Sequence, residues 1–553
     1  MNDFVDVIPL GGLGEFGMNC TVLRSGSDLV VIDAGMAFPR GDHGSDLGVQ
    51  AVVPDFAFLK ENRDQVRAVI LTHGHEDHAG AVSFLLQDLD VPVFGSRLTL
   101  GLVGEKLKER RIGRQHLNVI GPRHRLDFGP FKIETLNVTH SYPESFCLAI
   151  DSPAGCLMWT GDFKFDPTPI DGKVSDLHRL AAYGEAGVTA LFSDSTNSTR
   201  PGLAPSEVSV IEPLRDIFRK ARRKIIASTF ASSIHRIQIL TDLAAEFGRS
   251  VVPLGRSMIT NIRIAQAMGY LNPSQGVISP AEASELRPEK VLILASGSQA
   301  EPMSALTRLA VGQIKNLEVE EEDTVILSTR IIPGNERPIA RLINLFYRKG
   351  ARVYDSSQSP VHVSGHGYRD DLKLMMNLTR PRFFVPIHGE YQQLKTHCWI
   401  AQEQGIPAER MAIVENGDVL RIQRDGIAIV DRIHAGRRFI DEGALEEVHE
   451  TVLRERRYLA EDGFVMVLLQ IDRQSGELMA EPDIVSRGFR SLDESEDLVN
   501  TMKQKIVEVM EEISLEEKLD EDLLNEILRK ELRRILRKRT GKRPLVLSMA
   551  VEV

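Results

Sequence analysis

Short apolar runs alternate with polar loops from residue 1 to about residue 204, and many of these runs have the length and β-branched composition of strands. Between them, stretches such as 79–86 have the apolar spacing of helices. This mixture predicts a layered domain of sheets and helices whose loops present polar residues at strand ends. The predicted strands cover residues 6–10, 29–33, 68–72, 131–138, 146–150 and 156–160.

The pattern changes at about residue 205 to repeated strand, loop and helix units, which predict an inserted domain with a parallel, doubly wound sheet. After about residue 355 the first pattern returns, so the first domain is expected to be discontinuous. The units that carry this prediction are strand 225–229 with helix 233–247, strand 291–294, strand 324–327 with helix 337–348, and strand 382–386 with helix 391–404.

The last hundred or so residues predict a small α+β unit, built from strand 464–471, two charged amphipathic helices between 491 and 538, and strand 544–551. An apolar strand near a terminus offers an edge for pairing, so we expect this unit to mediate a homodimer or homotetramer. The predicted boundaries are 1–205 and 356–440 for the first domain, 206–355 for the insert, 441–460 for a linker and 461–553 for the C-terminal domain.

The composition is that of an ordinary globular protein, with 42% hydrophobic and 26% charged residues, and it leaves both an enzyme and a binding protein open. The net charge of −11 is unfavourable for a protein that approaches a polyanion, so any contact with nucleic acid must be local. Segments 219–224 and 533–543 are the candidates for such contacts, although charge runs at helical spacing are more often solvated faces.

No apolar run is long enough to span a bilayer, and no basic stretch followed by a hydrophobic segment opens the chain, so a cytoplasmic protein without a membrane anchor is expected. The cysteines lie far apart without a C-x-x-C pair. Their spacing argues against a disulfide framework and against a zinc ribbon. They are Cys20, Cys147, Cys156 and Cys398.

The segment Gly12-Leu-Gly-Glu-Phe-Gly17 matches the G-x-G-x-x-G fingerprint of dinucleotide-binding domains, and Asp33 lies near the place of a ribose-binding acid. The fingerprint requires a helix after the glycines. Here Ser25-Gly-Ser-Asp28 separates two apolar runs, which is typical of a β-hairpin. We therefore expect no dinucleotide site, and interpret the glycines as a tight loop beside the active site or as an ordinary turn.

The strongest chemical signal is the segment Leu71-Thr-His-Gly-His-Glu-Asp-His-Ala-Gly80, in which an H-x-H-x-D-H motif directly follows an apolar strand. Imidazole and carboxylate groups are ligands that suit zinc. The motif brings His73, His75, Asp77 and His78 into six positions, so a metal site is predicted.

Further ligands are expected at other strand ends, because four residues cannot surround two metal ions. His140, Asp162 and His388 each follow a predicted strand. Open sheets place their chemistry where strands lead into loops. The shared position of these three residues, more than any one of them alone, favours a common site.

Several motifs resemble those of the metallo-β-lactamase superfamily and, within it, the β-CASP nucleases of the ribonuclease J family. The resemblance covers nearly the whole chain. It implies an α/β protein, with a metallo-β-lactamase αββα sandwich, an inserted doubly wound β-CASP domain and a small α+β C-terminal domain. The motifs are the H-x-H-x-D-H segment, Leu10 to Asn19, Ser193-Asp-Ser-Thr-Asn197, His362-Val-Ser-Gly-His366 and Ile387-His-Gly-Glu390.

The resemblance also implies two zinc ions per subunit, with Mn²⁺ or Mg²⁺ as alternative metals. Asp33 is expected to orient ligand histidines through hydrogen bonds, the other interpretation being a turn residue at a strand end. The implied ligands are His73, His75 and His140 for one ion, Asp77, His78 and His388 for the other, and Asp162 between the two.

Two zinc ions can activate water and stabilise phosphoryl oxygens, so phosphodiester hydrolysis is the expected chemistry. By resemblance, His366 would protonate the leaving oxygen and Asp194 would orient it, with Asp77 also in the catalytic set. His362 is interpreted as structural. The expected phosphate-binding residues are Ser364, Gly365 and His366, together with Ser232 and Ser233, which could equally only cap a helix.

The activity implied is cleavage of single-stranded RNA to products with a 5′-phosphate and a 3′-hydroxyl, by 5′-to-3′ exonuclease and endonuclease action, in rRNA processing and mRNA decay. Association with other RNA-processing proteins is also expected. The alternatives are a DNA-directed nuclease, a tRNA-processing nuclease or another hydrolase on this scaffold, and a non-catalytic RNA-binding subunit. The presence of the full ligand set argues against the last of these.

Overall fold

The structure is a computed structural model that describes residues 3–39, 47–274, 276–301, 303–332, 334–441, 447–472, 474–489 and 496–552. The chain divides into two compact units, residues 1–38 with 51–438 and residues 39–50 with 439–553. Part of the predicted linker, 442–446, lies outside the described residues, and helix α14 (Glu450–Asp462) begins before its predicted end.

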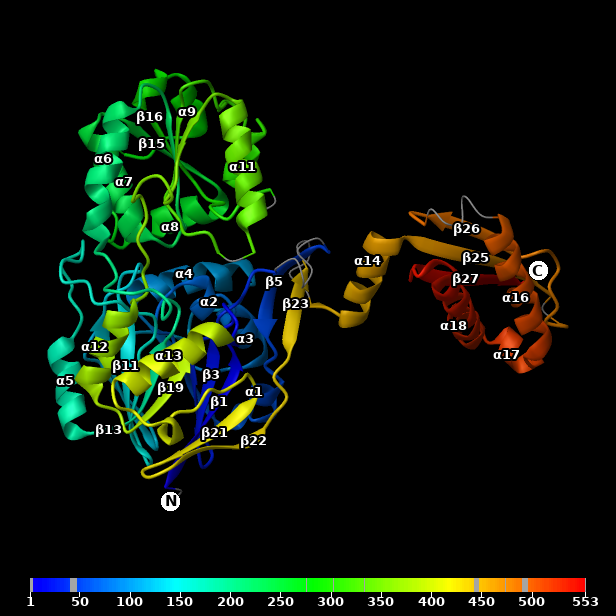
Figure 1. The fold of residues 1–553 in the computed structure, drawn as a ribbon, viewed down its shortest axis with the longest axis horizontal. Helices are drawn as coiled ribbons and strands as arrows, with labels where there is room; N and C mark the ends of the chain where they lie inside the picture. Colours follow the sequence, from blue (N-terminus) through cyan, green and yellow to red (C-terminus); the bar gives the residue numbers. More distant parts are fainter. Residues whose placement is uncertain are drawn as a thin grey trace. The chain divides into compact units, whose positions relative to one another are not determined.

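Two mixed sheets form the base of the first unit (Figure 1). In the eight-stranded sheet the order is β22 (Ile427–Arg432), β21 (Asp418–Gln423), β1 (Phe4–Gly11), β3 (Cys20–Ser25), β4 (Asp28–Ile32), β6 (Val66–Ile70), β7 (Val93–Gly95) and β8 (Leu117–Val119). In the six-stranded sheet it is β19 (Phe383–Ile387), β13 (Val188–Asp194), β12 (Gly155–Trp159), β11 (Ser145–Ser152), β10 (Phe131–Val138) and β9 (Arg125–Phe128).

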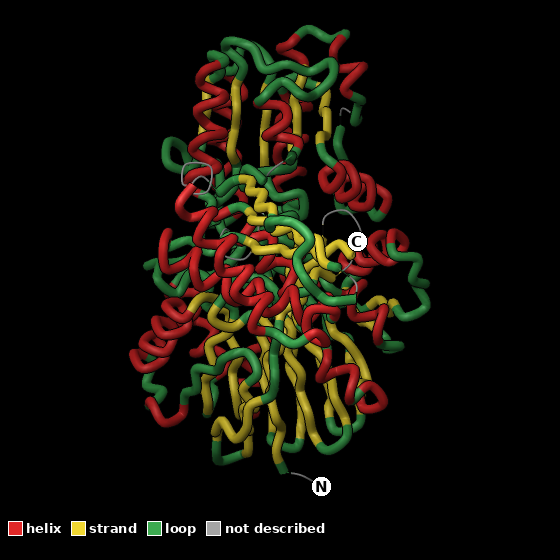
Figure 2. The backbone as a smooth tube through the Cα atoms, turned by 90° about the vertical axis from the view of Figure 1, so that its right-hand side faces the viewer, coloured by secondary structure: helices red, strands yellow, loops and turns green. Residues whose placement is uncertain are grey.

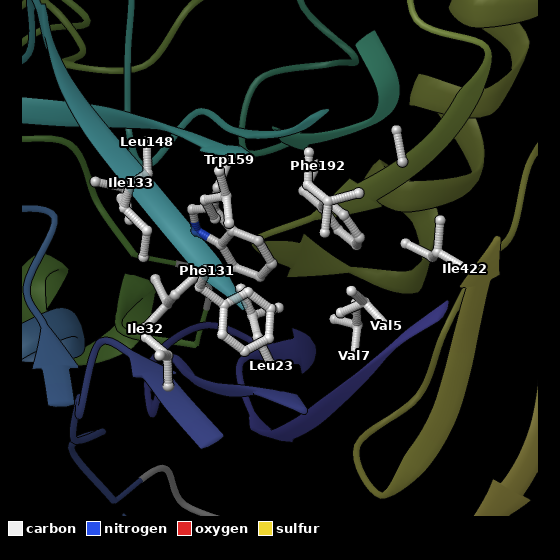
Figure 3. Packing of buried hydrophobic residues seen from close by; sticks show 14 of the residues in the cluster. Val5, Val7, Leu23, Ile32, Phe131, Ile133, Leu148, Trp159, Phe192 and Ile422 are labelled. Atoms are coloured by element: carbon white, nitrogen blue, oxygen red, sulfur yellow. The ribbon is translucent and has the colours of Figure 1, made fainter. Parts of the chain in front are cut away.

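The two sheets pack face to face through one hydrophobic core. Val7 and Leu23 of the first sheet meet Phe131 and Trp159 of the second, and all four side chains are buried (Figure 3). Alternate residues of a strand point to opposite faces, so the same strands supply a second apolar face to the helices outside. Burial on both faces explains why these strands read as almost continuous apolar runs.

Helices cover the outer faces and complete the predicted αββα sandwich, which the structure confirms. The predicted helix 79–86 is divided into two at Gly80 and Ala81. Helices α5 (Leu177–Ala186), α12 (Arg369–Thr379) and α13 (Tyr391–Glu403) share a core with the six-stranded sheet. The other helices of this part are α1 (Ala57–Glu61), η2 (Arg63–Gln65), α2 (Glu76–Ala79), α3 (Val82–Asp88), α4 (Arg97–Glu109) and η5 (Ala408–Arg410).

The inserted segment forms an all-parallel five-stranded sheet between helices, as predicted (Figure 1, Figure 2). Its order is β15 (Ser250–Leu254), β16 (Val291–Ala295), β14 (Ile225–Ser228), β17 (Thr324–Leu327) and β18 (Arg352–Tyr354). Ile225 packs with one helix layer and Ile226 with the other. The helices are η3 (Glu207–Val210), α6 (Ile211–Lys220), α7 (Ile234–Glu246), α8 (Arg256–Ala267), α9 (Pro280–Ser284), η4 (Pro288–Lys290), α10 (Ala305–Ala310) and α11 (Glu336–Arg348).

The second unit contains a three-stranded sheet, ordered β26 (Asp483–Arg487), β25 (Phe464–Ile471) and β27 (Leu545–Glu552). Three helices follow where two were predicted: α16 (Glu496–Glu512), the short α17 (Leu515–Leu519) and α18 (Glu521–Thr540). Val465 and Val467 of β25 pack against α16 and α18, whereas β27 exposes Leu547 and Met549 on the other face. A further three-stranded sheet contains β24 (Glu447–Val448), β23 (Arg437–Asp441) and β5 (Val49–Pro54), in that order.

The glycine-rich segment near the N-terminus leads into a hairpin and not into a helix. Strands β3 and β4 pair antiparallel around the turn at Gly26, which confirms the predicted hairpin. Just before it, β2 (Leu13–Gly14) pairs with β20 (Gly389–Glu390), directly after His388. The glycine loop therefore lies beside a predicted metal ligand.

No helix among the described residues is long and apolar enough to cross a membrane. All four cysteines are free, and Cys20, Cys147 and Cys398 are buried. Burial raises the pKa of the Cys398 thiol to about 11. The cysteines therefore act as small apolar core residues.

Candidate metal centre

The H-x-H-x-D-H segment runs from the loop after strand β6 into helix α2, with His75 as the N-cap of that helix. Its backbone is fixed by the N-terminal hairpin region, because Asn19 donates its amide N–H to the carbonyl of Asp77 at 3.0 Å and Ala34 donates to that of His78 at 2.8 Å. Gly35 permits this approach, since a Cβ atom there would lie 1.6 Å from the Asp77 carbonyl oxygen. Only glycine fits at position 35.

The ligands predicted from separate strand ends meet at this segment. Three overlapping groups could each hold a metal ion, with the ligand atoms of each group within 4.8 Å of one another. Two of them contain the predicted ligands and share Asp162: His73, His75, His140 and Asp162, and Asp77, His78, Asp162 and His388. The third consists of Asp162, Asp194, His366 and His388.

The ring nitrogens that face away from the cluster are held by the protein. Nδ1 of His78 lies 2.8 Å from Oδ2 of Asp33, and Nδ1 of His140 lies 2.8 Å from the carbonyl oxygen of Gly365. A carbonyl oxygen can only accept, so Nδ1 of His140 carries the proton and Nε2 presents a lone pair to the cluster. Such outer hydrogen bonds are the usual means of orienting histidine ligands.

The inward-facing nitrogens converge closely. Nδ1 of His75 lies 3.0 Å from Nε2 of His73 and 3.1 Å from Nε2 of His140. Burial is the main reason that the pKa values of His73 and His140 are well below the ordinary value, so both rings are neutral. Buried lone pairs that face one another in this way are stabilised by a cation between them.

Asp162 is the acid shared by the two groups of predicted ligands. It is 2% exposed, and neither carboxylate oxygen has a hydrogen-bond partner among the described residues. Burial disfavours its charged form, but His388, His78 and His366 outweigh that effect and hold the pKa of Asp162 below its ordinary value. A buried charged acid with unused lone pairs fits a position between two cations.

The acids of the cluster raise the pKa of His388. Burial lowers the pKa of this imidazole, but Asp162, Asp194 and Asp77 outweigh the effect and raise it to about 10. His388 Nε2 lies 3.3 Å from Oδ2 of Asp77 and 3.7 Å from Oδ1 of Asp162. The site therefore favours positive charge at the point where a metal ion is expected.

Asp33 makes the contacts that were expected of an orienting acid. Besides His78, it accepts hydrogen bonds from the amide N–H of Thr72 at 2.7 Å and from the Thr72 hydroxyl at 2.9 Å. Its φ angle is 61°, and that of His388 is 55°, so both lie in the left-handed region that non-glycine residues rarely adopt. Such backbone conformations are characteristic of functional sites.

Asp194 ends strand β13 and connects two histidines. Its Oδ2 lies 2.8 Å from Nδ1 of His366, whereas its Oδ1 accepts from the Thr196 hydroxyl at 2.7 Å. The Thr196 oxygen also lies 2.7 Å from Nδ1 of His388. His366 keeps its Nε2 available, and its side chain is 19% exposed, so it can reach a bound substrate.

The predicted phosphate-binding residues fall into two groups: Ser364 and Gly365 contact residues of the metal site, whereas Ser232 and Ser233 lie at the start of α7. Ser364 accepts hydrogen bonds from Nδ2 of Asn197 at 2.9 Å and from the amide of His366 at 3.2 Å, and Gly365 packs against His140. Ser233 is the N-cap of α7 but makes no side-chain capping bond, and Ser232 precedes it. The structure gives neither of these two hydroxyls a hydrogen bond to a described residue of the cluster.

Other candidates lie outside the metal groups. His362 belongs to none of the groups found among the described residues.

In the basic segment 219–224, Arg223 lies 2.6 Å from Glu320, and Arg219 and Lys224 contact Asp216 and Glu320. This pairing leaves the segment with much less free positive charge than the sequence indicates.

The sequence interpretation missed Thr196, Thr72, Asn197 and Arg330. Thr196 and Asn197 lie in the Ser193 to Asn197 motif, and Thr72 precedes His73, so polar residues beside the ligands were the available signal. Arg330 had no such signal, because it belongs to the inserted sheet and reaches Asn197 only in the folded chain.

Family models match most of the chain. The metallo-β-lactamase superfamily matches residues 13–200, and the ribonuclease J β-CASP domain matches residues 222–346. A Zn-dependent metallo-hydrolase RNA specificity domain matches residues 358–410, and the ribonuclease J C-terminal domain matches residues 451–553.

Whole-chain relatives agree with these matches. Ribonuclease J of Synechocystis is 40% identical over 506 residues, which is 91% of this chain and 77% of the relative. Ribonuclease J of Thermus thermophilus is 40% identical over 92% of this chain and 88% of the relative, and ribonuclease J2 of Bacillus subtilis is 36% identical over 99% of both.

A solved structure of a protein of unknown function from Enterococcus faecalis has a TM-score of 0.51 at 14% identity, and covers 77% of this chain and 100% of that one. This likeness concerns the fold alone. The identities of 36% to 40% over most of the length, with the domain matches, show that the chain belongs to the ribonuclease J family.

Proposed function

We propose that this chain cleaves single-stranded RNA with two zinc ions per subunit, by 5′-to-3′ exonuclease and endonuclease action. The broader statement, that it is a metal-dependent ribonuclease, rests on its family and on the histidine–aspartate cluster. The more specific statement, that two zinc ions act in each subunit, is supported by the convergence of ligands from separate strand ends. This convergence is the observation that carries the proposal.

The donor set fits two divalent cations. The unsatisfied oxygens of Asp162 and the facing lone pairs of His73 and His140 both require positive charge nearby. The proposed ligands are His73, His75, His140 and Asp162 for one ion and Asp77, His78, Asp162 and His388 for the other. When bound, such ions activate water and stabilise charge on phosphoryl oxygens.

His366 supplies the proton that the leaving 3′-oxygen needs. Asp194 accepts from Nδ1 of His366, so Nε2 is the atom that faces the substrate and exchanges the proton. Protonation of the 3′-oxygen leaves a 3′-hydroxyl on one product and a 5′-phosphate on the other. Asp194 does not transfer this proton but holds the imidazole in place.

Substrate phosphates would be bound by the segment that carries His366. The Ser364 hydroxyl oxygen accepts from Asn197 and from the amide of His366, so its own O–H can donate to a phosphate oxygen, and Gly365 lies between Ser364 and His366. Ser232 and Ser233 lie where β14 leads into α7, and the N-terminus of a 13-residue helix favours anions as well. Both pairs of residues are proposed as phosphate contacts.

The decisive experiment compares four matched substrates under zinc loading: linear RNA with a 5′-monophosphate, linear RNA with a 5′-triphosphate, circular RNA and single-stranded DNA. Mononucleotides released from monophosphate RNA support exonuclease action, and cleaved circles support endonuclease action. Cleavage must stop on chelation and return with zinc. Chelator-resistant cleavage, or cleavage of DNA alone, would overturn the proposal.

Self-association as a homodimer or homotetramer is proposed for the C-terminal unit, whose strand β27 exposes Leu547, Met549 and Val551. Sedimentation of the full chain over a range of concentrations tests it. Cytoplasmic location and association with other RNA-processing proteins stay predictions from the sequence.

A further inference from the structure

We propose that Arg330 and Arg200 form a binding site for a backbone phosphate of RNA, next to the site of cleavage. The inference rests on the proposed ribonuclease function and adds a contact made by the inserted domain. It concerns affinity for the phosphate backbone, and so predicts no preference for particular bases.

Arg330 reaches from the inserted domain to the catalytic segment. It follows strand β17, and its Nη1 donates to Oδ1 of Asn197 at 2.6 Å. Nδ2 of the same Asn197 donates to the carbonyl oxygen of His366 at 3.1 Å. The Arg330 guanidinium is therefore held against the residues that position His366, the proposed proton donor.

The backbone that carries Arg330 is fixed by a buried glutamine. Nε2 of Gln299 donates to the carbonyl oxygen of Arg330 at 2.8 Å, and Oε1 of Gln299 accepts from the amide of Ile332 at 2.9 Å. Gln299 is only 5% exposed. A cation on a supported loop loses less conformational freedom when it binds a ligand.

Arg200 comes from the first domain, and its amide N–H donates at 2.9 Å to the carbonyl oxygen of Asn197, the residue whose side chain accepts from Arg330. Nη1 of Arg200 donates to the Tyr368 hydroxyl at 3.0 Å, and its guanidinium carbon lies 5.5 Å from the centre of that ring. Burial lowers the pKa of Arg330, and the positive charge of Arg200 lowers it further. Two cations that repel each other in the free protein would be stabilised by an anion between them.

Arg330 and Arg200 differ from Arg236 and Arg223 of the insert in the partners of their side chains. Arg236 is buried and lies 2.7 Å from Glu207, and Arg223 lies 2.6 Å from Glu320. By contrast, no carboxylate among the described residues lies within 4.0 Å of either guanidinium of the proposed site. Arg330 and Arg200 contact a neutral amide and a phenol, so their charge and most of their N–H groups are available.

A phosphate is the anion that fits. A guanidinium presents paired N–H groups that match the oxygens of a phosphate, and it stays charged at neutral pH. The chain as a whole carries −11, and the metal cluster contains acids, so cations beside His366 would offset repulsion of RNA where it must approach most closely. The nearby His362 is also in a positive environment, because burial and the charges of Arg236 and Arg330 hold the pKa of its imidazole well below the ordinary value.

The test measures binding of a fluorescent single-stranded RNA to zinc-loaded protein in a His366→Ala background, over a series of salt concentrations. Arg330→Gln is expected to raise Kd about tenfold. The slope of log Kd against log salt should become shallower by about 0.7 for the lost phosphate contact. Arg330→Lys should keep most of the slope while losing part of the affinity, because it retains the charge but not the planar fork.

Arg352→Gln is the matched control. It removes the same charge from the inserted sheet at the opposite end, since Arg352 pairs in register with Thr324 at the start of β17, and its side chain is 57% exposed. Its Kd and slope should equal those of the parent. Arg200→Gln is expected to raise Kd and lower the salt slope as Arg330→Gln does. If the Arg330 variant misfolds, which a loss of zinc would reveal, the Arg200 variant still tests the proposal.

Equal slopes and affinities for Arg330→Gln, Arg200→Gln and Arg352→Gln would overturn this inference alone. A parent protein that neither binds nor cleaves RNA would instead overturn the proposed function. A shallower slope with single-stranded DNA as well as RNA supports the phosphate site, because both polymers share that backbone.

Discussion

The Thr196 hydroxyl oxygen lies 2.7 Å from Nδ1 of His388. The same hydroxyl lies 2.7 Å from Oδ1 of Asp194, whose charged carboxylate can only accept. Thr196 therefore donates its proton to Asp194 and accepts Nδ1–H from His388. This arrangement leaves Nε2 of His388 facing Asp77 and Asp162, so Nε2 is the nitrogen that would give up its proton to bind a metal ion.

Replacing Thr196 by valine should weaken zinc binding about 10- to 100-fold, since the hydrogen bond that orients His388 is lost while the side-chain volume is kept. Competition with a chromogenic chelator measures this directly. Thr196→Ser retains the hydroxyl and should restore most of the affinity. Thr379→Val makes the same change at another buried position, whose hydroxyl donates to the Met375 carbonyl, and should bind zinc normally.

Replacing His366 by alanine should slow RNA cleavage by about 10²- to 10⁴-fold, because the proposed proton donor is removed. Zinc content should stay near that of the parent, since His366 is not one of the proposed ligands and all of these are kept. Single-turnover rates and metal analysis on the same preparation provide the two measurements. Cleavage at the parental rate would refute the proton-transfer role.

Replacing His388 or Asp77 by alanine should instead lower metal content and turnover together. Both residues belong to the same candidate group, and their side chains lie 3.3 Å apart. Added zinc should partly restore activity if the ligand roles are correct. A variant with full zinc content and parental turnover would exclude that residue as a ligand.

Replacing Arg236 by methionine should destabilise the inserted domain by about 3 to 5 kcal/mol, because Glu207 is left as an unpaired buried charge. Arg236 is 1% exposed, and besides Glu207 it donates to the Val361 carbonyl at 2.8 Å and to Ser328. Urea unfolding followed by circular dichroism measures the loss. The double variant Arg236→Met with Glu207→Met should recover part of it, and equal loss in both variants would contradict the ion-pair explanation.

Replacing Met549 by glutamate should weaken self-association, because a charge would enter the exposed apolar face of β27, where Met549 is 47% exposed. Sedimentation equilibrium should show a higher dissociation constant for the assembly. Ile429→Glu is the control, on strand β22 of the other unit at 48% exposure. If only the Ile429 variant dissociates, the C-terminal unit is not the interface.

The pattern of hydrophobic and polar residues along the chain was sufficient to predict most of the strands and helices. Strands β10 and β25 were predicted with the ends that the structure shows, because apolar residues recur along both segments. The helix predicted over 79–86 is interrupted instead, because at the break the amide N–H of Ala81 donates to the carbonyl oxygen of Ala34 at 2.8 Å. That break depends on a neighbour far away in the sequence and leaves no periodic signal.

The sequence alone determined which side chains are available as metal ligands, because they are concentrated in one short motif and at the ends of predicted strands. It could not determine which ring nitrogen each histidine presents, nor that Arg330 would lie beside His366. Those properties depend on contacts such as Asp194 with His366, 172 positions apart, and His388 with Asp77, 311 positions apart. Tertiary structure alone decides them, because hydrogen bonds and charges act over a few ångströms in space, whatever the separation along the chain.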